Sequence, residues 1–211
     1  MLGLLLAAAA VTFDPSSASD LKLDNAVIAR ETFKNVRSLR VEPATRDPNH
    51  SGLVALPLPP FHDGSIELEL AGDVAPDADA GARGFVGIAF RLQPGNRYEC
   101  FYLRPTNGRA DDQLRRNHSL QYVSEPDYPW ERLRQEAPGV YESYADLQAG
   151  AWTRVRIEVS GIKARLYVNG AEQPALIVNE LKRGDSSGAI GLWVGPGSIG
   201  HFSMLRVAAR R

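Results

Sequence analysis

The feature that most constrains this chain is a series of short runs in which apolar and polar residues alternate. From residue 26 onward, Gly, Pro or Asn interrupts these runs repeatedly, and no long stretch has the spacing of an amphipathic helix. Alternation with period two gives each strand one buried and one solvated side, so the pattern predicts an all-β sandwich or barrel. The expected strands cover 26–33, 37–42, 52–57, 64–71, 84–92, 97–104, 118–124, 152–160, 162–169, 174–179, 188–194 and 199–208.

One long stretch, residues 105–150, lacks this alternation. Two short helices are expected within it, at 108–116 and 130–137. The second begins just after Pro129, a residue that suits the first helical turn, and it has apolar residues at helical spacing. We therefore expect one long loop that carries short helices.

A tight hairpin is expected in the C-terminal third. If residues 160 and 161 form its two-residue turn, the apolar residues of both strands share one face. Glu158 then faces Lys163, which is a favourable pair of opposite charges. Arg156 faces Arg165, which is unfavourable unless both side chains extend into solvent or meet an acid.

A second hairpin is more informative about function. Residues 85–93 run up, Pro94 and Gly95 turn, and residues 96–104 return. With Gln93 paired to Asn96, one face is mostly apolar, and the other sets small residues opposite Tyr and Arg. Such a face builds a shallow ligand groove, but a cover from the long loop would make the same tyrosines packing residues. The candidate ligand contacts on this face are Arg91, Tyr98, Tyr102 and Arg104.

Aromatic residues gather in one part of the chain. Six of the seven tyrosines lie between 98 and 144, and residues 97–144 also hold eight acids and seven arginines. Aromatic rings can cover the CH-rich side of a sugar while polar groups bind its hydroxyls, so this composition favours a neutral carbohydrate, although a long loop also needs such residues to hold itself in place. No nucleic acid is expected, because the net charge of -1 gives no positive channel. The further candidate contacts are Asn117, Gln121, Tyr122 and Trp130.

His118 is the best candidate for acid–base chemistry, because the pKa of histidine lies near neutrality. It would share a strand face with Tyr122. Glu142 is the candidate acid beside it, although no spacing forces two carboxylates to converge as ordinary glycoside hydrolysis requires. Glu99 falls on the apolar face of the second hairpin, where an acid pairs with an arginine or has a raised pKa.

No cofactor and no metal ion is expected. The single cysteine, Cys100, excludes an internal disulfide and a cysteine-based zinc site. Asp111 and Asp112 leave calcium open, because calcium takes oxygen ligands, but adjacent aspartates also occur in loops and at helix starts.

The N-terminus has features of an export signal. Residues 2–11 form an apolar run that is too short to span a bilayer, and small residues suited to cleavage follow it. No Lys or Arg precedes the run, so a first strand or an N-terminal extension is the alternative. We expect residues 1–19 to be a signal peptide or a disordered extension, and residues 20–211 to be one domain. The expected location is the periplasm or the extracellular space, without insertion into the membrane.

The C-terminal third carries a series of motifs that resembles a known superfamily. They read Trp152-Thr-Arg-Val-Arg-Ile-Glu-Val-Ser-Gly, Ala164-Arg-Leu-Tyr-Val-Asn-Gly, Ser187-Gly-Ala-Ile-Gly-Leu-Trp-Val and His201-Phe-Ser-Met-Leu-Arg-Val. In this order they resemble the concanavalin A-like lectin/glucanase superfamily, and residues 84–91 and 98–104 fit its central hairpin. The resemblance covers roughly residues 60–208 and looks closest to the laminin-G-like and 3-keto-disaccharide hydrolase branches.

This resemblance implies a two-sheet antiparallel jelly roll with a carbohydrate-related role. The Glu-x-Asp-x-x-Glu strand of the superfamily's glucanases does not occur in the sequence, which puts their reaction in doubt. Our leading hypothesis is a carbohydrate-binding domain that uses the 85–104 hairpin face and the 105–144 loop. The second is a glycoside hydrolase or lyase acting on 3-keto-disaccharides or related glycosides. The third is a non-catalytic module that binds a protein. A carboxylate close to His118 would favour the second, and a face closed by the long loop would favour the third.

Overall fold

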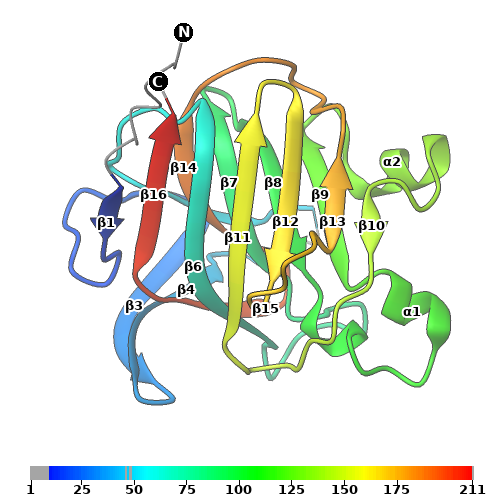
Figure 1. Cartoon of the computed structure of the whole chain (residues 1–211). Helices are drawn as coiled ribbons and strands as arrows, with labels where there is room; N and C mark the ends of the chain where they lie inside the picture. Colours follow the sequence, from blue (N-terminus) through cyan, green and yellow to red (C-terminus); the bar gives the residue numbers. More distant parts are fainter. Residues whose placement is uncertain (1–9, 46, 48, 211) are drawn as a thin grey trace, which may run out of the picture.

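The alternating runs form the strands of two antiparallel sheets that pack face to face (Figure 1). This computed structural model describes residues 10–45, 47 and 49–210. Sheet A consists, in spatial order, of β13 (Leu176–Val178), β12 (Lys163–Val168), β11 (Thr153–Ser160), β6 (Asp63–Val74), β15 (Ser198–Phe202), β4 (Val36–Pro43) and β3 (Ala26–Phe33), with β16 (Leu205–Arg210) paired to β6 and β1 (Val11–Phe13) paired to β16. Sheet B consists of β10 (Glu142–Ser143), β9 (Leu120–Glu125), β8 (Arg97–Leu103), β7 (Val86–Gln93), β14 (Ala189–Val194), β5 (Gly52–Ala55) and β2 (Lys22–Asp24). The predicted two-sheet jelly roll is therefore confirmed.

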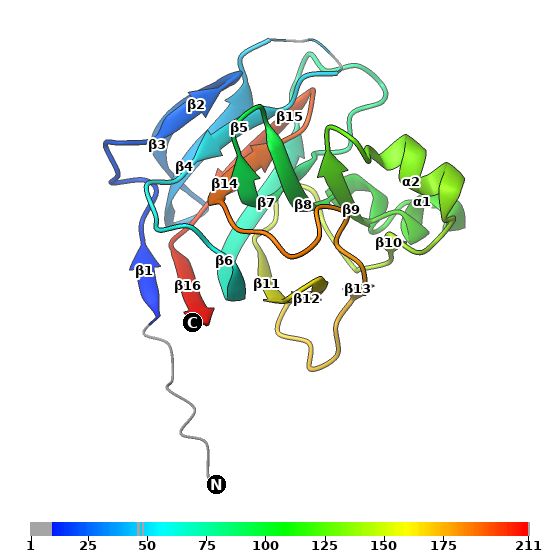
Figure 2. The same cartoon turned by 90° about the horizontal axis from the view of Figure 1, so that it is seen from above.

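The stretch between β8 and β11 carries the short helices, as predicted, and it also supplies β9 and β10 of sheet B. It contains the 3-10 helix η1 (Pro105–Asn107), α1 (Gln113–Asn117) and α2 (Trp130–Glu136). Both α-helices lie at the end of the molecule next to β9 and β10 (Figures 1 and 2). This arrangement sets the loop beside the edge of sheet B.

Apolar side chains from the inner faces of both sheets form the core. Their positions follow the period-two alternation, because every second residue of a strand points toward the opposite sheet. The fully buried members include Leu39, Phe61, Ile66, Leu70, Ile88, Phe90, Phe101, Leu103, Leu120 and Phe202. Polar residues of the same strands of sheet A point outward into solvent.

The predicted register of the β11–β12 hairpin is wrong by two residues. The turn begins one residue later, at Gly161, whose φ of 55° suits glycine. The faces stay as predicted, because a shift of two residues is one full strand period. The actual register sets Glu158 opposite Arg165 and Arg156 opposite Tyr167, so the unfavourable pair of arginines does not form.

The last expected strand, 199–208, is two strands, β15 and β16. They are separated at Ser203 and Met204 and pair with successive parts of β6. The backbone N–H of Ser203 still donates to the carbonyl of Glu69 at 3.0 Å, so the chain stays attached to β6 across the break. The short strands β1, β2 and β10 were not among the expected strands, since β1 and β2 precede residue 26 and β10 has only two residues.

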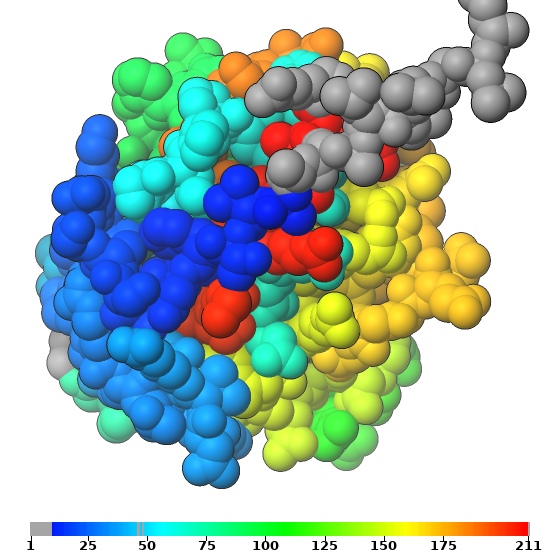
Figure 3. All heavy atoms as spheres, turned by 60° about the vertical axis from the view of Figure 1, so that its left-hand side comes forward, coloured from blue at the N-terminus to red at the C-terminus, as the bar shows by residue number. Residues whose placement is uncertain are grey.

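The N-terminal segment joins the fold before residue 20. β1 pairs with β16, which brings the start of the described chain against its end, as the neighbouring blue and red surfaces in Figure 3 show. Residues 1–9 lie outside the described residues, so the export signal and the location stay predictions. No helix in the described part of the chain is long and apolar enough to cross a membrane.

Candidate functional site

The β7–β8 hairpin forms the centre of the candidate site. Residues 86–90 pair with residues 99–103 in the predicted register, and Gly87 lies opposite Tyr102. A Cβ at Gly72 of sheet A would come within 2.6 Å of the Val86 side chain, so Val86 points toward sheet A. Gly87 and Tyr102 therefore belong to the outer face of sheet B, the face on which a ligand groove was expected.

Aromatic side chains of the protein fill the centre of this outer face. The rings of Tyr102 and Trp193 stack with centroids 4.7 Å apart, and Trp193 Nε1 donates to the Tyr98 hydroxyl at 3.1 Å. Tyr98, Tyr102 and Trp193 are 7%, 3% and 7% exposed. Gly87 makes this packing possible, because a Cβ there would lie 2.5 Å from Tyr102 Cβ. The tyrosines at the centre of this face are therefore packing residues and do not line a ligand groove.

Arg91 does not lie on this face, and that expectation is wrong. The pairing of β7 with β8 shifts after Phe90, and Arg91 has a φ of 52°, so an irregularity in the strand redirects its side chain. The fully buried guanidinium donates to the carbonyls of His62, Gly184 and Gly161 and to an Asp63 carboxylate oxygen. Arg91 therefore joins three segments of the chain and is not available to a ligand.

Arg104 is the centre of a polar cluster where β8 leaves sheet B. Its Nη2 donates to the Tyr102 hydroxyl at 2.8 Å and to Gln121 Oε1 at 3.0 Å. Its Nη1 donates to the His118 carbonyl at 3.1 Å and to Glu142 Oε1 at 3.2 Å. We call Tyr102, Arg104, His118, Gln121, Arg134 and Glu142 the Arg104 cluster.

Glu142 is the acid that balances this cluster. Its side chain is 3% exposed, and it accepts hydrogen bonds from Arg134 Nε at 2.9 Å and from Arg134 Nη2 as well as from Arg104. Burial by itself would raise the pKa of Glu142, but the hydrogen bonds and charge of Arg134 and the charge of Arg104 outweigh it, so the pKa lies below its ordinary value. Glu142 therefore stays ionised at neutral pH.

His118 lies beside this carboxylate. It caps the C-terminus of α1 instead of lying on β9, and its Nε2 is 3.5 Å from Glu142 Oε2. Partial burial lowers the pKa of His118, and the charges of Arg134 and Arg104 lower it further against the opposing effect of Glu142. The imidazole is therefore neutral at pH 7. The two candidate catalytic residues are neighbours, which no spacing in the sequence required.

Tyr122 and Asn117 lie apart from the cluster. Tyr122 points into the core, so it does not share a face with His118, and its hydroxyl donates to Glu99 at 2.5 Å. Burial raises the pKa of Glu99, as the position of an acid on the apolar face predicted. Asn117 is exposed, and its side chain accepts a hydrogen bond from Gln113 one turn earlier on α1.

The cluster reaches solvent at a rim made by α2 and the segment after β10. The ring centroid of Trp130 lies 4.5 Å from the guanidinium carbon of Arg134 and 5.7 Å from that of Arg104, and Trp130 is 37% exposed. Tyr144 is 40% exposed, and its hydroxyl accepts from Arg116 Nη2 at 2.9 Å. This rim offers exposed aromatic surface beside arginine N–H groups.

The structure brings six of the ten predicted site residues together: Tyr102, Arg104, His118, Gln121, Trp130 and Glu142. Sequence reasoning missed Arg134 and Trp193. Arg134 could have been found, because it lies four residues after Trp130 on a predicted helix. Trp193 could not, because its place depends on the pairing of β14 with β7, which are far apart in the sequence.

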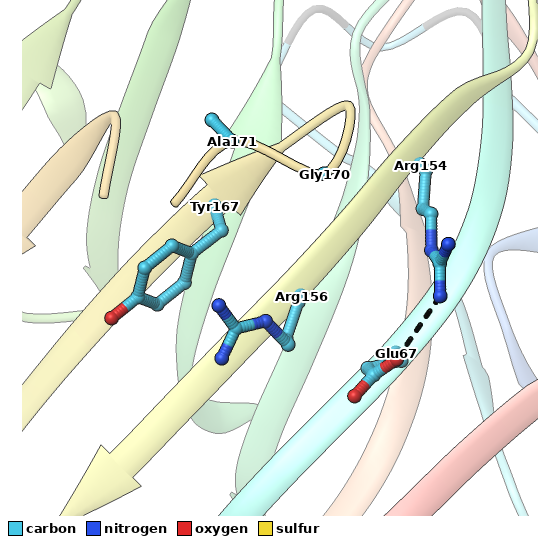
Figure 4. Close-up of a pocket in the computed structure, with 6 residues that line it drawn as sticks. All are labelled: Glu67, Arg154, Arg156, Tyr167, Gly170 and Ala171. Carbon is cyan, nitrogen blue, oxygen red and sulfur yellow. Dashed lines mark ion pairs between the residues drawn. The ribbon is translucent and has the colours of Figure 1, made fainter. Parts of the chain in front are cut away.

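The outer face of sheet A carries two adjoining hollows of about 390 and 540 Å³ that share Glu67 and Arg154. Figure 4 shows the smaller hollow, where Arg154 forms an ion pair with Glu67 across the strands at 3.6 Å. The guanidinium carbon of Arg156 lies 3.8 Å from the ring centroid of Tyr167. Since Tyr167 is only 7% exposed, the hollow offers little free aromatic surface for a sugar.

Three side chains could offer ligands to a metal ion: His62, Asp63 and Asp185. Their ligand atoms lie within 4.8 Å of one another. Arg91 Nη2 lies 3.1 Å from Asp63 Oδ1 and 3.7 Å from Asp185 Oδ1, so its charge already neutralises the group. Asp112, for which calcium was left open, accepts the backbone N–H of Arg115 and caps α1. Neither group fits a resident metal well.

Solved structures establish the fold. No protein-family model and no curated protein matches the sequence. The carbohydrate-binding module CBM66 from Bacillus subtilis superposes with a TM-score of 0.59 at 10% identity, over 89% of this chain and 94% of that chain. A Bacillus licheniformis β-glucanase superposes with a TM-score of 0.55 at 10% identity, over 95% of this chain and 98% of that chain. Domain 4 of AbnA, an extracellular arabinanase from Geobacillus stearothermophilus, was solved with arabinotriose. It superposes with a TM-score of 0.51 at 14% identity, over 90% of this chain and 82% of that chain.

The class of structure is therefore a concanavalin A-like jelly roll, as the sequence resemblance predicted. At such low identity the likeness establishes the fold and leaves the activity open. The laminin-G-like and 3-keto-disaccharide hydrolase branches stay predictions.

Proposed function

We propose that the protein binds a carbohydrate at the exposed rim of the Arg104 cluster. The observation that carries the proposal is Trp130, a partly exposed indole beside the guanidinium groups of Arg104 and Arg134. Its ring can cover the CH-rich side of a sugar, while Arg134 and His118 can bind hydroxyl groups. This combination of apolar face and polar neighbours is what a sugar requires.

Two further observations support a ligand at the rim. The chain shares its fold with a carbohydrate-binding module and with an arabinanase domain solved with arabinotriose. The centre of the sheet B face is filled by Tyr98, Tyr102 and Trp193, so a sugar has no room there. We therefore assign the contacts to Trp130, Arg134 and His118 and treat the buried residues as their support.

Affinity electrophoresis against a panel of soluble polysaccharides, followed by calorimetry on the best ligand, tests this proposal. Trp130→Ala should weaken binding about tenfold, because it removes the stacking surface. Ile177→Ala is a matched control, since Ile177 is 46% exposed on the other sheet. Failure of the wild-type protein to bind any glycan, or undiminished binding by Trp130→Ala, would refute the proposal.

A second function, glycoside cleavage, is favoured by the contact between His118 and Glu142. A neutral imidazole whose Nε2 faces a carboxylate that is ionised at neutral pH can accept a proton at Nδ1, while Glu142 orients the ring. Glu142 is held ionised by two arginines, so it does not supply the proton that a leaving group needs. His118 would be the base, as in a lyase or in cleavage of a keto-glycoside.

Incubation with 3-keto-disaccharides and related glycosides tests this second function. His118→Gln should abolish turnover but weaken sugar binding only in part, because Trp130 and Arg134 keep their contacts and glutamine can still hydrogen-bond a hydroxyl group. Turnover that survives this change, or no turnover by the wild-type protein, would refute the hypothesis that the protein cleaves glycosides with His118 as the base.

The third function, a module that binds a protein, is favoured by the filled centre of the sheet B face. Protein binding becomes the preferred hypothesis over carbohydrate binding if no glycan in the panel binds.

A further inference from the structure

Two arginines beside the Arg104 cluster have no acidic partner. Arg83 Nη1 donates to the carbonyls of Ala80 and Ala82 at 2.6 and 2.7 Å, and Arg115 Nη2 reaches Asn107 Oδ1 at 3.5 Å. Neither guanidinium forms an ion pair with an acid in the described part of the chain. Arg104, by contrast, is paired to Glu142.

The fold brings these two arginines to the same place from different segments. The carbonyl of Arg83 accepts the backbone N–H of Thr106, which lies in η1 directly after Arg104. The side chain of Arg115, on α1, contacts the last residue of η1, Asn107. Arg83 and Arg115 therefore both converge on η1, next to Arg104.

These positive charges act on one another. Partial burial lowers the pKa of Arg83, and the charges of Arg115 and Arg104 lower it further. Two carboxylates of this region are already engaged, because Glu142 bridges Arg104 and Arg134, and Asp112 caps α1 through the backbone N–H of Arg115. The charges of Arg83 and Arg115 therefore remain without a salt bridge among the described residues.

Unpaired arginines that repel one another cost stability, so their grouping needs another explanation. Each guanidinium has five N–H donors in a planar fork, and the contacts above occupy only some of them. The fork matches the two oxygens of a carboxylate or the oxygens of a sulfate. The grouping thus has the donors and the charge to hold an oxyanion.

We propose that Arg83 and Arg115 bind the carboxylate or sulfate group of an acidic sugar whose ring, or whose neighbouring ring, lies on Trp130. Arg104 connects the two parts: its guanidinium carbon lies 5.7 Å from the Trp130 ring centroid, and its Nη1 donates to the same His118 carbonyl as the Asn107 side chain of η1. The inference rests on the proposed carbohydrate binding and proposes an acidic sugar in place of the neutral one that the composition favoured. It names the ligand class as acidic glycans.

Calorimetry at low ionic strength tests the inference with four probes. They are a galacturonic acid oligosaccharide, a galactose oligosaccharide of equal length, dextran sulfate, and polyglutamate as a polyanion without sugar. We expect at least one acidic glycan to bind about tenfold more tightly than the neutral one, and this advantage to shrink in high salt because charge screening is stronger there. Preference for galacturonate or for dextran sulfate distinguishes a carboxylate site from a sulfate site.

Two variants locate the site. Arg83→Gln and Arg115→Gln should each weaken the acidic ligand about tenfold and leave the neutral ligand unchanged. Arg165→Gln is the matched control, because it removes the same charge from an exposed position on sheet A. Arg115 is also exposed, so its variant should fold, and thermal melting checks this.

The outcomes separate the inference from the function beneath it. Equal binding of neutral and acidic glycans, with loss on Trp130→Ala, overturns the inference and leaves carbohydrate binding intact. If polyglutamate binds as tightly as the acidic glycan, the site recognises negative charge alone, which overturns both the acidic-sugar inference and the proposed carbohydrate binding. Acidic binding that neither Arg83→Gln nor Arg115→Gln weakens overturns the assigned site.

Discussion

Replacing Glu142 with glutamine tests whether a single carboxylate holds the Arg104 cluster together. The carboxylate is 3% exposed and neutralises Arg104, whose side chain is 6% exposed, as well as Arg134. Removing one partner of a buried ion pair costs about 3–5 kcal/mol, because the other charge is left without compensation. Glutamine keeps one oxygen acceptor, so we expect the lower end, about 3 kcal/mol. For a chain of this size, that lowers Tm by about 6–12 °C.

The pH dependence of this loss identifies its cause. The pKa of Glu142 is lower in the folded protein than in the unfolded chain, so the unfolded state binds more protons as the pH falls. The contribution is complete above about pH 4.3, the ordinary pKa of glutamate, and is lost as the pH falls through the lowered native pKa. The wild type and Glu142→Gln should therefore differ most near pH 7 and converge in acid.

Guanidinium chloride unfolding, repeated from pH 7 down to pH 3, measures both quantities. Glu136→Gln is the matched control, since Glu136 forms an exposed ion pair with Arg132 at 2.7 Å and should cost less than about 0.5 kcal/mol. A loss below about 1 kcal/mol for Glu142→Gln, or a loss that is as large at pH 3 as at pH 7, would refute the reasoning.

Three further experiments test the packing. Gly87→Ala should cost about 2 kcal/mol or more in unfolding free energy, because the new Cβ would lie 2.3 Å from a carbonyl oxygen of β8. Gly81→Ala, with no atom within 4 Å, should change it by less than about 0.5 kcal/mol, and equal effects would contradict the packing argument. Cys100 is fully buried, and burial raises the pKa of its thiol well above the usual value. A thiol-reactive dye should therefore label it only in denaturant, and rapid labelling of native protein would be evidence against this. Arg91→Lys should cost about 3 kcal/mol in unfolding free energy, because lysine cannot reach all the fixed acceptors, whereas Arg165→Lys should be nearly neutral; similar losses would mean that the buried bonds contribute little.

Sequence reasoning was most reliable where structure depends on neighbouring residues. Alternation located the long strands, and the register of residues 86–90 against 99–103 was correct. It was less reliable at turns. In the β11–β12 hairpin, two adjacent turn positions give the same faces and differ only in their cross-strand partners. In the observed register Arg156 lies opposite Tyr167 with its guanidinium over the ring, a contact that the turn residues alone do not indicate.

The site was harder to predict because it depends on irregular backbone and on distant pairing. Alternation assigned Arg91 to the outer face, but a local shift in pairing turns the side chain inward. Periodicity cannot reveal such a shift, because each residue type in the segment also fits a regular strand. The contact between His118 and Glu142 likewise depends on β10 pairing with β9, and β10 is only two residues long.

The β7–β8 hairpin has a buried arginine at each end. Near the turn, Arg91 binds three backbone carbonyls from separate segments, and at the opposite end Arg104 binds residues from β9, from β10 and from the end of α1. Opening either end locally would leave a guanidinium without its acceptors, so the hairpin has no low-energy way to separate from the sheet. Its amide hydrogens should exchange only through unfolding of the whole domain, while those of α1, which has no buried residue, exchange through local opening. The hairpin is thus fixed at both ends, so the surrounding loops can vary in sequence without changing the position of the hairpin in the sandwich.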